Sequence, residues 1–217
     1  HHGVLFLDEL QEMPRSVLDA LRQPMEDGRV LIARAQQSVS FPARFALVGA
    51  MNPCPCGQAG AEPQRCTCSP FDVAKHRARV SGPLADRIDM TIQVPPVAIS
   101  ALRSRAAGED SATVRTRVVA ARARQIERFR RMRRVNCNAQ AQGRWLDAHT
   151  AVADDARSLL AMSAERFALS ARGYHRVLKV ARTIADLDGV DEVARTHVAE
   201  ALYFRLPEKL PAIAVPA

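Results

Sequence analysis

The sequence has no apolar run approaching the ~20 residues that cross a bilayer, so a helical membrane span is excluded. No signal-peptide pattern opens it, because two histidines lead straight into the first apolar stretch, and we expect a cytoplasmic protein. The histidines are either native or the end of a tag. Acids are scarce, with 23 aspartates and glutamates against 31 lysines and arginines, for a net charge of +8. That imbalance predicts a polyanionic partner, nucleic acid before membrane.

The first stretch that carries chemistry is an apolar run that ends in two acids. The run is Val4-Leu5-Phe6-Leu7, and Asp8-Glu9 follow it. Four apolar residues in a row suit a central parallel strand buried on both faces, and ligands bind at the carboxyl ends of such strands. An Asp there can hold Mg²⁺ while the next Glu polarises a water for attack on a phosphate, which is the Walker B pattern of P-loop ATPases. The alternative is a buried strand whose next loop opens with two acids.

A second strand of the same kind is predicted at Phe45-Ala46-Leu47-Val48-Gly49-Ala50, and Asn52 follows it. An Asn at that edge can orient the attacking water or contact a γ-phosphate. The alternative is that Asn52 is an ordinary turn residue before Pro53. Between the two strands we expect one helix from about Pro14 to Asp27, kinked near Pro24, and then a β-hairpin over 29–41.

Four cysteines lie in the fifteen-residue stretch that follows, at Cys54, Cys56, Cys66 and Cys68. Their number and softness match Zn²⁺, but structural zinc sites usually have two residues between paired cysteines, and here there is one. A strict strand would point alternate side chains to opposite faces, so the one-residue spacing requires a bend. Two interpretations stay open, a zinc site and a loop with reduced thiols.

Met90–Val94 reads as a last strand, and the proline pair after it places a domain boundary near residue 97. The rest reads as helices, with Ser170 and Asp191 as caps of the last two. Thr113–Asn136 holds nine arginines and a single glutamate. We expect one face to display Arg117, Arg124, Arg128 and Arg131 and the opposite face, around Val119, Ala123, Ile126 and Phe129, to dock. The arginine face predicts contacts to nucleic acid backbone. The alternatives are a solvated face, or arginines that pair with acids of the α/β half or of a neighbouring subunit.

The order of parts is specific. It reads GVLFLDEL, ALRQPMEDGRV, FALVGAMNPCPCG, SGPLADRIDM and SARGYHRVLKVARTIADL. This order resembles the magnesium-chelatase-like AAA+ ATPases, and within them the bacterial ComM/YifB branch associated with natural transformation and DNA branch migration. The resemblance covers essentially the whole chain. It implies an α/β plus all-α fold, with the carboxy-terminal part of an AAA+ core over 1–97 and a helical lid over 98–217.

By this resemblance, Asp8 and Glu9 are the Walker B acids and Asn52 is sensor 1. The hairpin corresponds to the pre-sensor-1 hairpin that lines the pore of ring helicases. Arg87 stands where the arginine finger would reach the neighbouring subunit's ATP, with Arg79 as the reserve.

Arg172 stands where sensor 2 would be, on the lid helix. A fixed guanidinium neutralises charge developing on the γ-phosphoryl group, so the residue types agree with these roles. The alternatives are an ion pair of Arg87 with Asp86 or Asp89, and a solvated first helical turn for Arg172.

The sequence departs from the family pattern because it contains no Gly-x-x-x-x-Gly-Lys-Ser/Thr loop. In the family that loop lies upstream, so we expect this chain to be the carboxy-terminal piece of a longer protein. Without the loop, the chain alone is expected to bind ATP poorly and to hydrolyse it negligibly.

Three functions follow, two for the longer protein and one for the chain alone. The first is an ATP-driven, hexameric ring motor that uses ATP and Mg²⁺ on branched or single-stranded DNA. The second is the motor subunit of a chelatase that inserts Mg into a porphyrin. The third concerns the chain by itself, as a non-enzymatic, stand-alone DNA- or protein-binding module. The cysteine loop and the arginine-rich helix favour the first by analogy.

Overall fold

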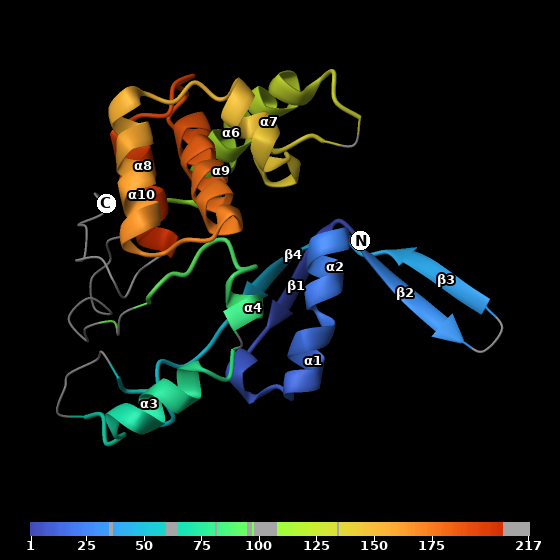
Figure 1. Ribbon diagram of the computed structural model, residues 1–217, viewed down its shortest axis with the longest axis vertical. Helices are drawn as coiled ribbons and strands as arrows, with labels where there is room; N and C mark the ends of the chain where they lie inside the picture. The colour runs from blue at the N-terminus through green and yellow to red at the C-terminus, as the bar shows by residue number, and fades with distance from the viewer. Residues whose placement is uncertain are drawn as a thin grey trace. The chain divides into compact units, whose positions relative to one another are not determined.

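The computed structural model describes residues 1–34, 37–59, 65–80, 82–94, 97, 108–133 and 135–205 (Figure 1). The chain divides into two compact units, residues 1–88 and 89–217. The boundary expected near residue 97 stays a prediction, since 95, 96 and 98–107 lie outside the described residues. No described helix is both long and apolar enough to cross a membrane.

The first unit is built on two parallel strands, β1 (Gly3–Leu7) and β4 (Phe45–Gly49), paired in register from Gly3 with Phe45 to Leu7 with Gly49. Both strands were predicted. One face of the pair turns Leu7 toward a small core of Leu10, Leu18 and Leu84.

The other face of this sheet is open, and the prediction of a strand buried on both faces is wrong for this chain. Val4 is 70% exposed, Phe6 58% and Val48 48%. A parallel strand is covered on both faces only where other elements pack there, and the described part of the chain supplies cover on one side.

The connection between the strands contains a short 3-10 turn (Leu10–Glu12), two short helices and a hairpin. The helices are α1 (Arg15–Ala20) and α2 (Arg22–Asp27), not the single kinked helix expected. Pro24 has no N–H to donate to the carbonyl of Ala20, which is where α1 ends. Gly28 then adopts a left-handed conformation (φ 64°) that closes α2.

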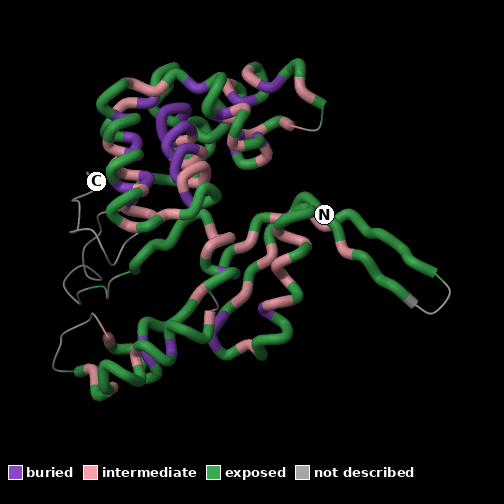
Figure 2. The backbone as a smooth tube through the Cα atoms, in the orientation of Figure 1, coloured by how far each residue is buried: buried purple, intermediate pink, exposed green. Residues whose placement is uncertain are grey.

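The hairpin pairs β2 (Arg29–Arg34) with β3 (Gln37–Pro42) in antiparallel register, as predicted. Cross-strand partners put Val30, Ile32, Val39 and Phe41 on one face. Most of the ribbon is exposed (Figure 2). Ile32 and Phe41 are among its exposed residues. The hairpin is an uncovered two-stranded ribbon with an apolar face.

After β4, a loop leads to α3 (Pro70–Arg77) and α4 (Gly82–Ala85). Ser69 caps α3 in a reciprocal capping box with Asp72. The strand expected at Met90–Val94 is wrong. This segment is irregular, and the Thr91 N–H donates to the carbonyl of Phe204 at 2.8 Å instead of to a neighbouring strand.

The regular elements described in the second unit are helices. They are α6 (Ser111–Phe129), a 3-10 turn (Asn138–Gln140), α7 (Gly143–His149), α8 (Asp154–Arg166), α9 (Ala171–Leu187) and α10 (Arg195–Arg205). Helix α9 is central: it contacts α6, α7 and α10, and much of it is buried (Figure 2). Its buried positions include Val177, Leu178, Ala181, Ile184 and Ala185, as its periodicity predicts.

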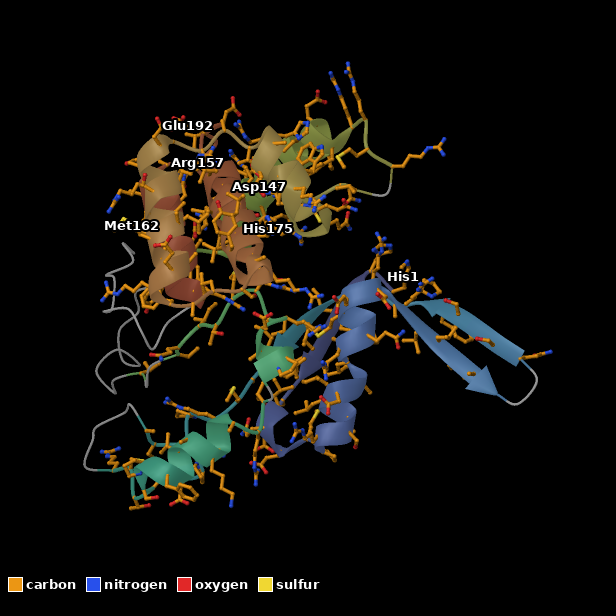
Figure 3. The ribbon with its side chains drawn as sticks, in the orientation of Figure 1. His1, Asp147, Arg157, Met162, His175 and Glu192 are labelled. Atoms are coloured by element: carbon orange, nitrogen blue, oxygen red, sulfur yellow. The ribbon has the colours of Figure 1, made fainter. Side chains whose placement is uncertain are left out.

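Polar contacts reinforce this helical packing. Ser170 caps α9 by accepting from the Gly173 N–H at 3.0 Å, as predicted. His175 of α9 and Asp147 of α7 lie beside each other, with Nε2 and Oδ2 2.8 Å apart (Figure 3). The cap predicted at Asp191 is wrong, because α10 begins four residues later and the His197 side chain accepts the Ala194 N–H.

Candidate functional site

The two acids predicted to hold the metal and activate water stand at the carboxyl end of β1. Asp8 Oδ1 accepts the Glu9 N–H at 2.9 Å, and both residues are exposed. Glu9 adopts a left-handed backbone (φ 50°, ψ 45°), which is uncommon for a residue with a side chain and costs of order 1–3 kcal/mol. Such strain persists only where the surroundings enforce it, and it clusters at functional sites.

Hydrogen bonds on both sides of Ala50 fix the edge where Glu9 stands. The Ala50 N–H donates to the Leu7 carbonyl at 2.9 Å, and the Ala50 carbonyl accepts from the Leu10 N–H at 2.9 Å. The turn carrying Asp8 and Glu9 is therefore bonded to the end of β4, two residues before Asn52. The sheet register thus brings the predicted sensor to the same edge as the predicted Walker B pair.

Backbone contacts also hold the segment that carries Asn52. His76 Nε2, on α3, lies 3.2 Å from the Asn52 carbonyl oxygen, and Arg77 Nε donates to Pro53 O at 3.4 Å. His76 is 5% exposed. The Asn52 side chain is exposed, while side chains of α3 hold the backbone of Asn52 and Pro53 in place.

The donor set at this edge suits a hard cation. Mg²⁺ prefers oxygen ligands and binds through one or two carboxylates together with substrate phosphates, and Asp8 and Glu9 offer carboxylates on an exposed rim. The phosphate cradle that would complete such a site has no counterpart in this sequence.

Arg87, the predicted arginine finger, is ion-paired with Glu26 of α2, and its Nη1 donates to Pro83 O at 2.8 Å. Its side chain is 13% exposed, so these contacts hold the guanidinium at the surface of the first unit. The pairing with Glu26 spans 61 residues, and no sequence pattern marks Glu26 as a partner. The reserve candidate Arg79 pairs with Glu12 at 2.7 Å, and both of these side chains are about half exposed.

Arg172 lies in the first turn of α9, exposed, in the second unit. Its assigned role as sensor 2 stays a prediction, since that role requires a defined position relative to the first unit.

The predicted docking face of α6 is right at Phe129, which is buried, and wrong for the rest of the helix. Val119 is 60% exposed and Ile126 55%, whereas the buried positions are Ala121, Gln125 and Phe129. The helix is therefore rotated from the orientation that its apolar residues suggested.

This rotation turns two of the four predicted DNA-contacting arginines toward carboxylates of their own unit. Arg128 Nη1 donates to Asp186 Oδ2 at 2.8 Å, and its side chain is 18% exposed. Arg124 is ion-paired with Asp191. On the open surface, Arg117 makes a bidentate pair with Glu109 at 2.8 and 2.9 Å, and Arg131 is exposed. Three of the four arginines therefore pair with acids, but these acids belong to the helical unit and not to the α/β half or a neighbouring subunit, as the alternative interpretation had it.

Asp186 is the centre of a buried network. It accepts from Asn138 Nδ2 at 2.8 Å and from Arg182 Nη2 at 3.0 Å, in addition to Arg128. Burial alone would raise the pKa of this carboxyl, but the hydrogen bonds from Arg128 and Asn138 hold it below its usual range. The acid is therefore ionised in the fold, and Arg128 is one of its counterions.

The four loop cysteines, whose shared site stays a prediction, converge in the structure: their Sγ atoms all lie within 4.8 Å of one another. Cys54 is fully buried and the other three are more accessible. Backbone N–H groups of Gln58 and Thr67 lower the pKa of the Cys56 thiol to about 6. A backbone hydrogen bond with Cys56 lowers the pKa of Cys68, but burial and the thiols of Cys56 and Cys54 outweigh it and raise that pKa to about 12. Sulfur atoms this close cannot all ionise without a cation between them.

Comparison with known proteins extends over both units. Residues 1–102 match the family model described as magnesium chelatase, subunit ChlI, and residues 108–205 match the one described as magnesium chelatase, subunit ChlI C-terminal. The chain is 42% identical over 210 residues to the competence protein ComM of Haemophilus influenzae. It is 40% identical over 211 residues to YifB of Salmonella typhimurium, and 40% identical over 222 residues to YifB of Escherichia coli.

These alignments cover 96–97% of this chain and 40% of each relative, so the chain spans about two fifths of the length of the proteins it matches. The two family models together account for both compact units. The chain belongs to the magnesium chelatase family, in the group that includes ComM and YifB.

Proposed function

We propose that this chain supplies part of the ATPase site of an AAA+ ring motor that acts on DNA. The observation that carries the proposal is the edge at the ends of β1 and β4, where the strained Glu9 and Asp8 share one rim with Asn52. Membership of the magnesium chelatase family supports an AAA+ type of protein and the use of ATP and Mg²⁺.

Each residue of this rim has a distinct proposed role. Asp8 holds the Mg²⁺ that accompanies ATP, and the ion supplies neutralising charge at the phosphates. Glu9 accepts a hydrogen bond from the attacking water and aligns it. Asn52 gives the same water, or the γ-phosphate, a second polar contact. The left-handed backbone of Glu9 keeps its carboxylate at the rim in a fixed direction.

Arg87 is the proposed finger toward a neighbouring subunit, which requires a homo-oligomeric ring. Glu26 now holds its guanidinium, and this contact would be exchanged for a phosphate when subunits assemble. Arg172 is proposed as sensor 2 in the lid.

The DNA part of the proposal rests on charge and on two elements. The net charge is +8, the hairpin is an exposed ribbon, and two exposed arginines lie at α6: Arg117 within the helix and Arg131 two residues after its last residue, Phe129. Because Arg124 and Arg128 are paired within the helical unit, we assign backbone contacts first to Arg117 and Arg131. The name of one relative, a competence protein, is compatible with this role.

A second candidate, the motor subunit of a magnesium chelatase, is favoured by the description of the matching family models. It would use the same ATPase rim but drive a partner protein instead of DNA. A non-enzymatic binding module would leave the strain at Glu9 without a role.

The test is ATP turnover by the whole protein, with and without forked DNA. Glu9→Gln should leave nucleotide binding intact and lower turnover by roughly 10²-fold or more, since it removes the residue that positions water. The matched control is Glu127→Gln on α6, where the carboxylate pairs with an exposed Arg130. Unchanged turnover in Glu9→Gln would refute the ATPase assignment. Normal turnover that DNA does not stimulate, with no binding to forked DNA at low salt, would favour the chelatase role.

A further inference from the structure

The loop between β4 and α3 is bent in the place where the one-residue cysteine spacing demands it. The Gly57 N–H donates to the Cys54 carbonyl at 2.9 Å, which makes Cys54–Gly57 a hydrogen-bonded β-turn with Pro55 at its second position. Gly57 has φ 74°, a conformation that glycine adopts without steric cost. The turn puts Cys54 and Cys56 on the same side, with their Sγ atoms 3.3 Å apart.

Two of the distances among the sulfur atoms match the spacing of a tetrahedral metal site. Zn–S bonds of about 2.3 Å at tetrahedral angles place sulfur atoms about 3.8 Å apart. Cys66 Sγ lies 3.8 Å from Cys54 Sγ and 3.7 Å from Cys56 Sγ. Cys68 Sγ completes the group within 4.8 Å of each of the others. A disulfide would need about 2.05 Å between two of these atoms, and all five cysteines are free thiols.

A backbone N–H contacts one of the sulfur atoms, as backbone N–H groups do in sites with metal-bound thiolates. The Ala59 N–H donates to Cys54 Sγ at 3.2 Å. Such contacts orient ligands and offset the negative charge of a tetrathiolate.

We propose that Cys54, Cys56, Cys66 and Cys68 together bind one Zn²⁺ in a closed, structural tetrathiolate site. Four sulfur ligands leave no open position for a reacting water, so the ion is structural and not catalytic. Zinc is favoured over harder cations because all four donors are soft. On binding, each thiol that is protonated loses its proton as its S–Zn bond forms.

The site joins the two ends of the loop that follows Asn52. Cys54 comes two residues after Asn52, and Cys68 immediately precedes Ser69, the cap of α3. The same helix reaches back to the carbonyls of Asn52 and Pro53 through His76 and Arg77. A metal that closes this loop therefore fixes the backbone at the rim. The metal site itself does not depend on the proposed ATPase function.

The experiment measures the metal content of the purified protein by native mass spectrometry and records the absorption spectrum of the Co²⁺-substituted form. We expect one Zn²⁺ per chain and the intense d–d bands of tetrahedral Co²⁺ with thiolate ligands. Cys68→Ser, at an accessible position, should weaken retention of zinc against a chelator at least about 10-fold, since losing one ligand costs more than a conservative change around the site. The matched control is Cys137→Ser, which changes a free thiol outside the cluster and should leave zinc retention unchanged.

Two results would overturn the proposal. One is a protein with no bound zinc and four thiols that alkylate freely before any chelator is added. The other is a disulfide between any two of the four. Because metal content is read without ATP or DNA, an inactive Glu9 variant that still holds zinc separates this proposal from the ATPase assignment.

Discussion

At the residue scale, the arginines of α6 show why charge in a sequence does not by itself locate a binding face. Arg128 lies beside the buried Phe129 and meets Asp186, which is 58 residues away and inaccessible. Arg117 forms an ion pair with Glu109, and both side chains are exposed to solvent. A buried carboxylate that loses its partner is costly, whereas an exposed pair contributes little.

We therefore predict a large loss of stability for one arginine change on this helix and a small effect for another. Arg128→Gln should lower the free energy of unfolding by about 3 kcal/mol, because Asp186 keeps its burial and loses a counterion. Arg117→Gln should change it by less than about 1 kcal/mol. Urea denaturation followed by the fluorescence of Trp145, the single tryptophan, measures both.

The same pair of variants separates folding from DNA binding. For each phosphate that Arg117 neutralises, Arg117→Gln should reduce the slope of log affinity against log salt by about 0.9 on duplex DNA. An Arg128→Gln protein with wild-type stability and weakened DNA binding would show that the ion pair with Asp186 is not what holds this arginine.

Residue roles set by local rules could be predicted from the sequence, and those set by distant partners could not. Ser170 caps α9 through an N–H three residues ahead, a contact that the spacing alone specifies. The acids at the end of β1 and the order of the two strands could likewise be predicted. The Glu26 partner of Arg87 and the left-handed Glu9 depend on packing between segments far apart in the chain, which no local pattern encodes.

At the element scale, periodicity predicted the buried face of α9, where an apolar stripe dominates although Arg182 and Asp186 are buried beside it, and it failed for most of α6. Helix α9 has a continuous apolar stripe and faces the core as predicted. Helix α6 buries Gln125, whose Oε1 accepts from Arg122 and from the Asn138 backbone, so its docked face is partly polar and its apolar stripe is exposed. The strand expected at Met90–Val94 does not form. Apolar and polar residues alternate there, but no strand among the described residues pairs with this segment.

The hairpin yields a prediction about one of its faces. Val30, Ile32, Val39 and Phe41 share a face, while Leu31 shares the other with Ala33, Ser38 and Ser40. Ile32→Ser should leave thermal stability nearly unchanged, because Ile32 is 46% exposed. If the apolar face is buried in the working motor, the same change removes roughly 1.5–3 kcal/mol of burial and lowers DNA-stimulated ATP turnover about 10-fold or more.

Leu31→Ser is the matched control, since Leu31 is 55% exposed on the opposite face of the same strand. Equal losses from both changes would indicate damage to the hairpin as a whole. No loss from either would remove the hairpin from the mechanism.

At the scale of the whole molecule, the two units differ in how much apolar surface they bury. Among the described residues, the helical unit has a cluster of 14 buried apolar residues, and the corresponding cluster of the α/β unit contains Leu10, Leu18 and Leu84. The open sheet face at Val4, Phe6 and Val48 adds no burial. Because burial of apolar surface is the main favourable contribution to folding, the α/β unit of this chain should be the less stable one.

We predict that the two units open independently and at different free energies. Hydrogen exchange read by mass spectrometry on the 217-residue chain should show backbone amides of α9 protected at least about 100-fold more than those of β1 and β4, which corresponds to roughly 3 kcal/mol. Leu178→Ala, in the helical core, should reduce protection in α9 by an amount equivalent to about 2–5 kcal/mol and leave β1 unchanged. Leu18→Ala, the same change in the small core, should accelerate exchange in β1 and β4 and leave α9 unchanged. If either variant sped exchange equally in both units, the chain would open as one cooperative body, and the difference in core size would not govern its stability.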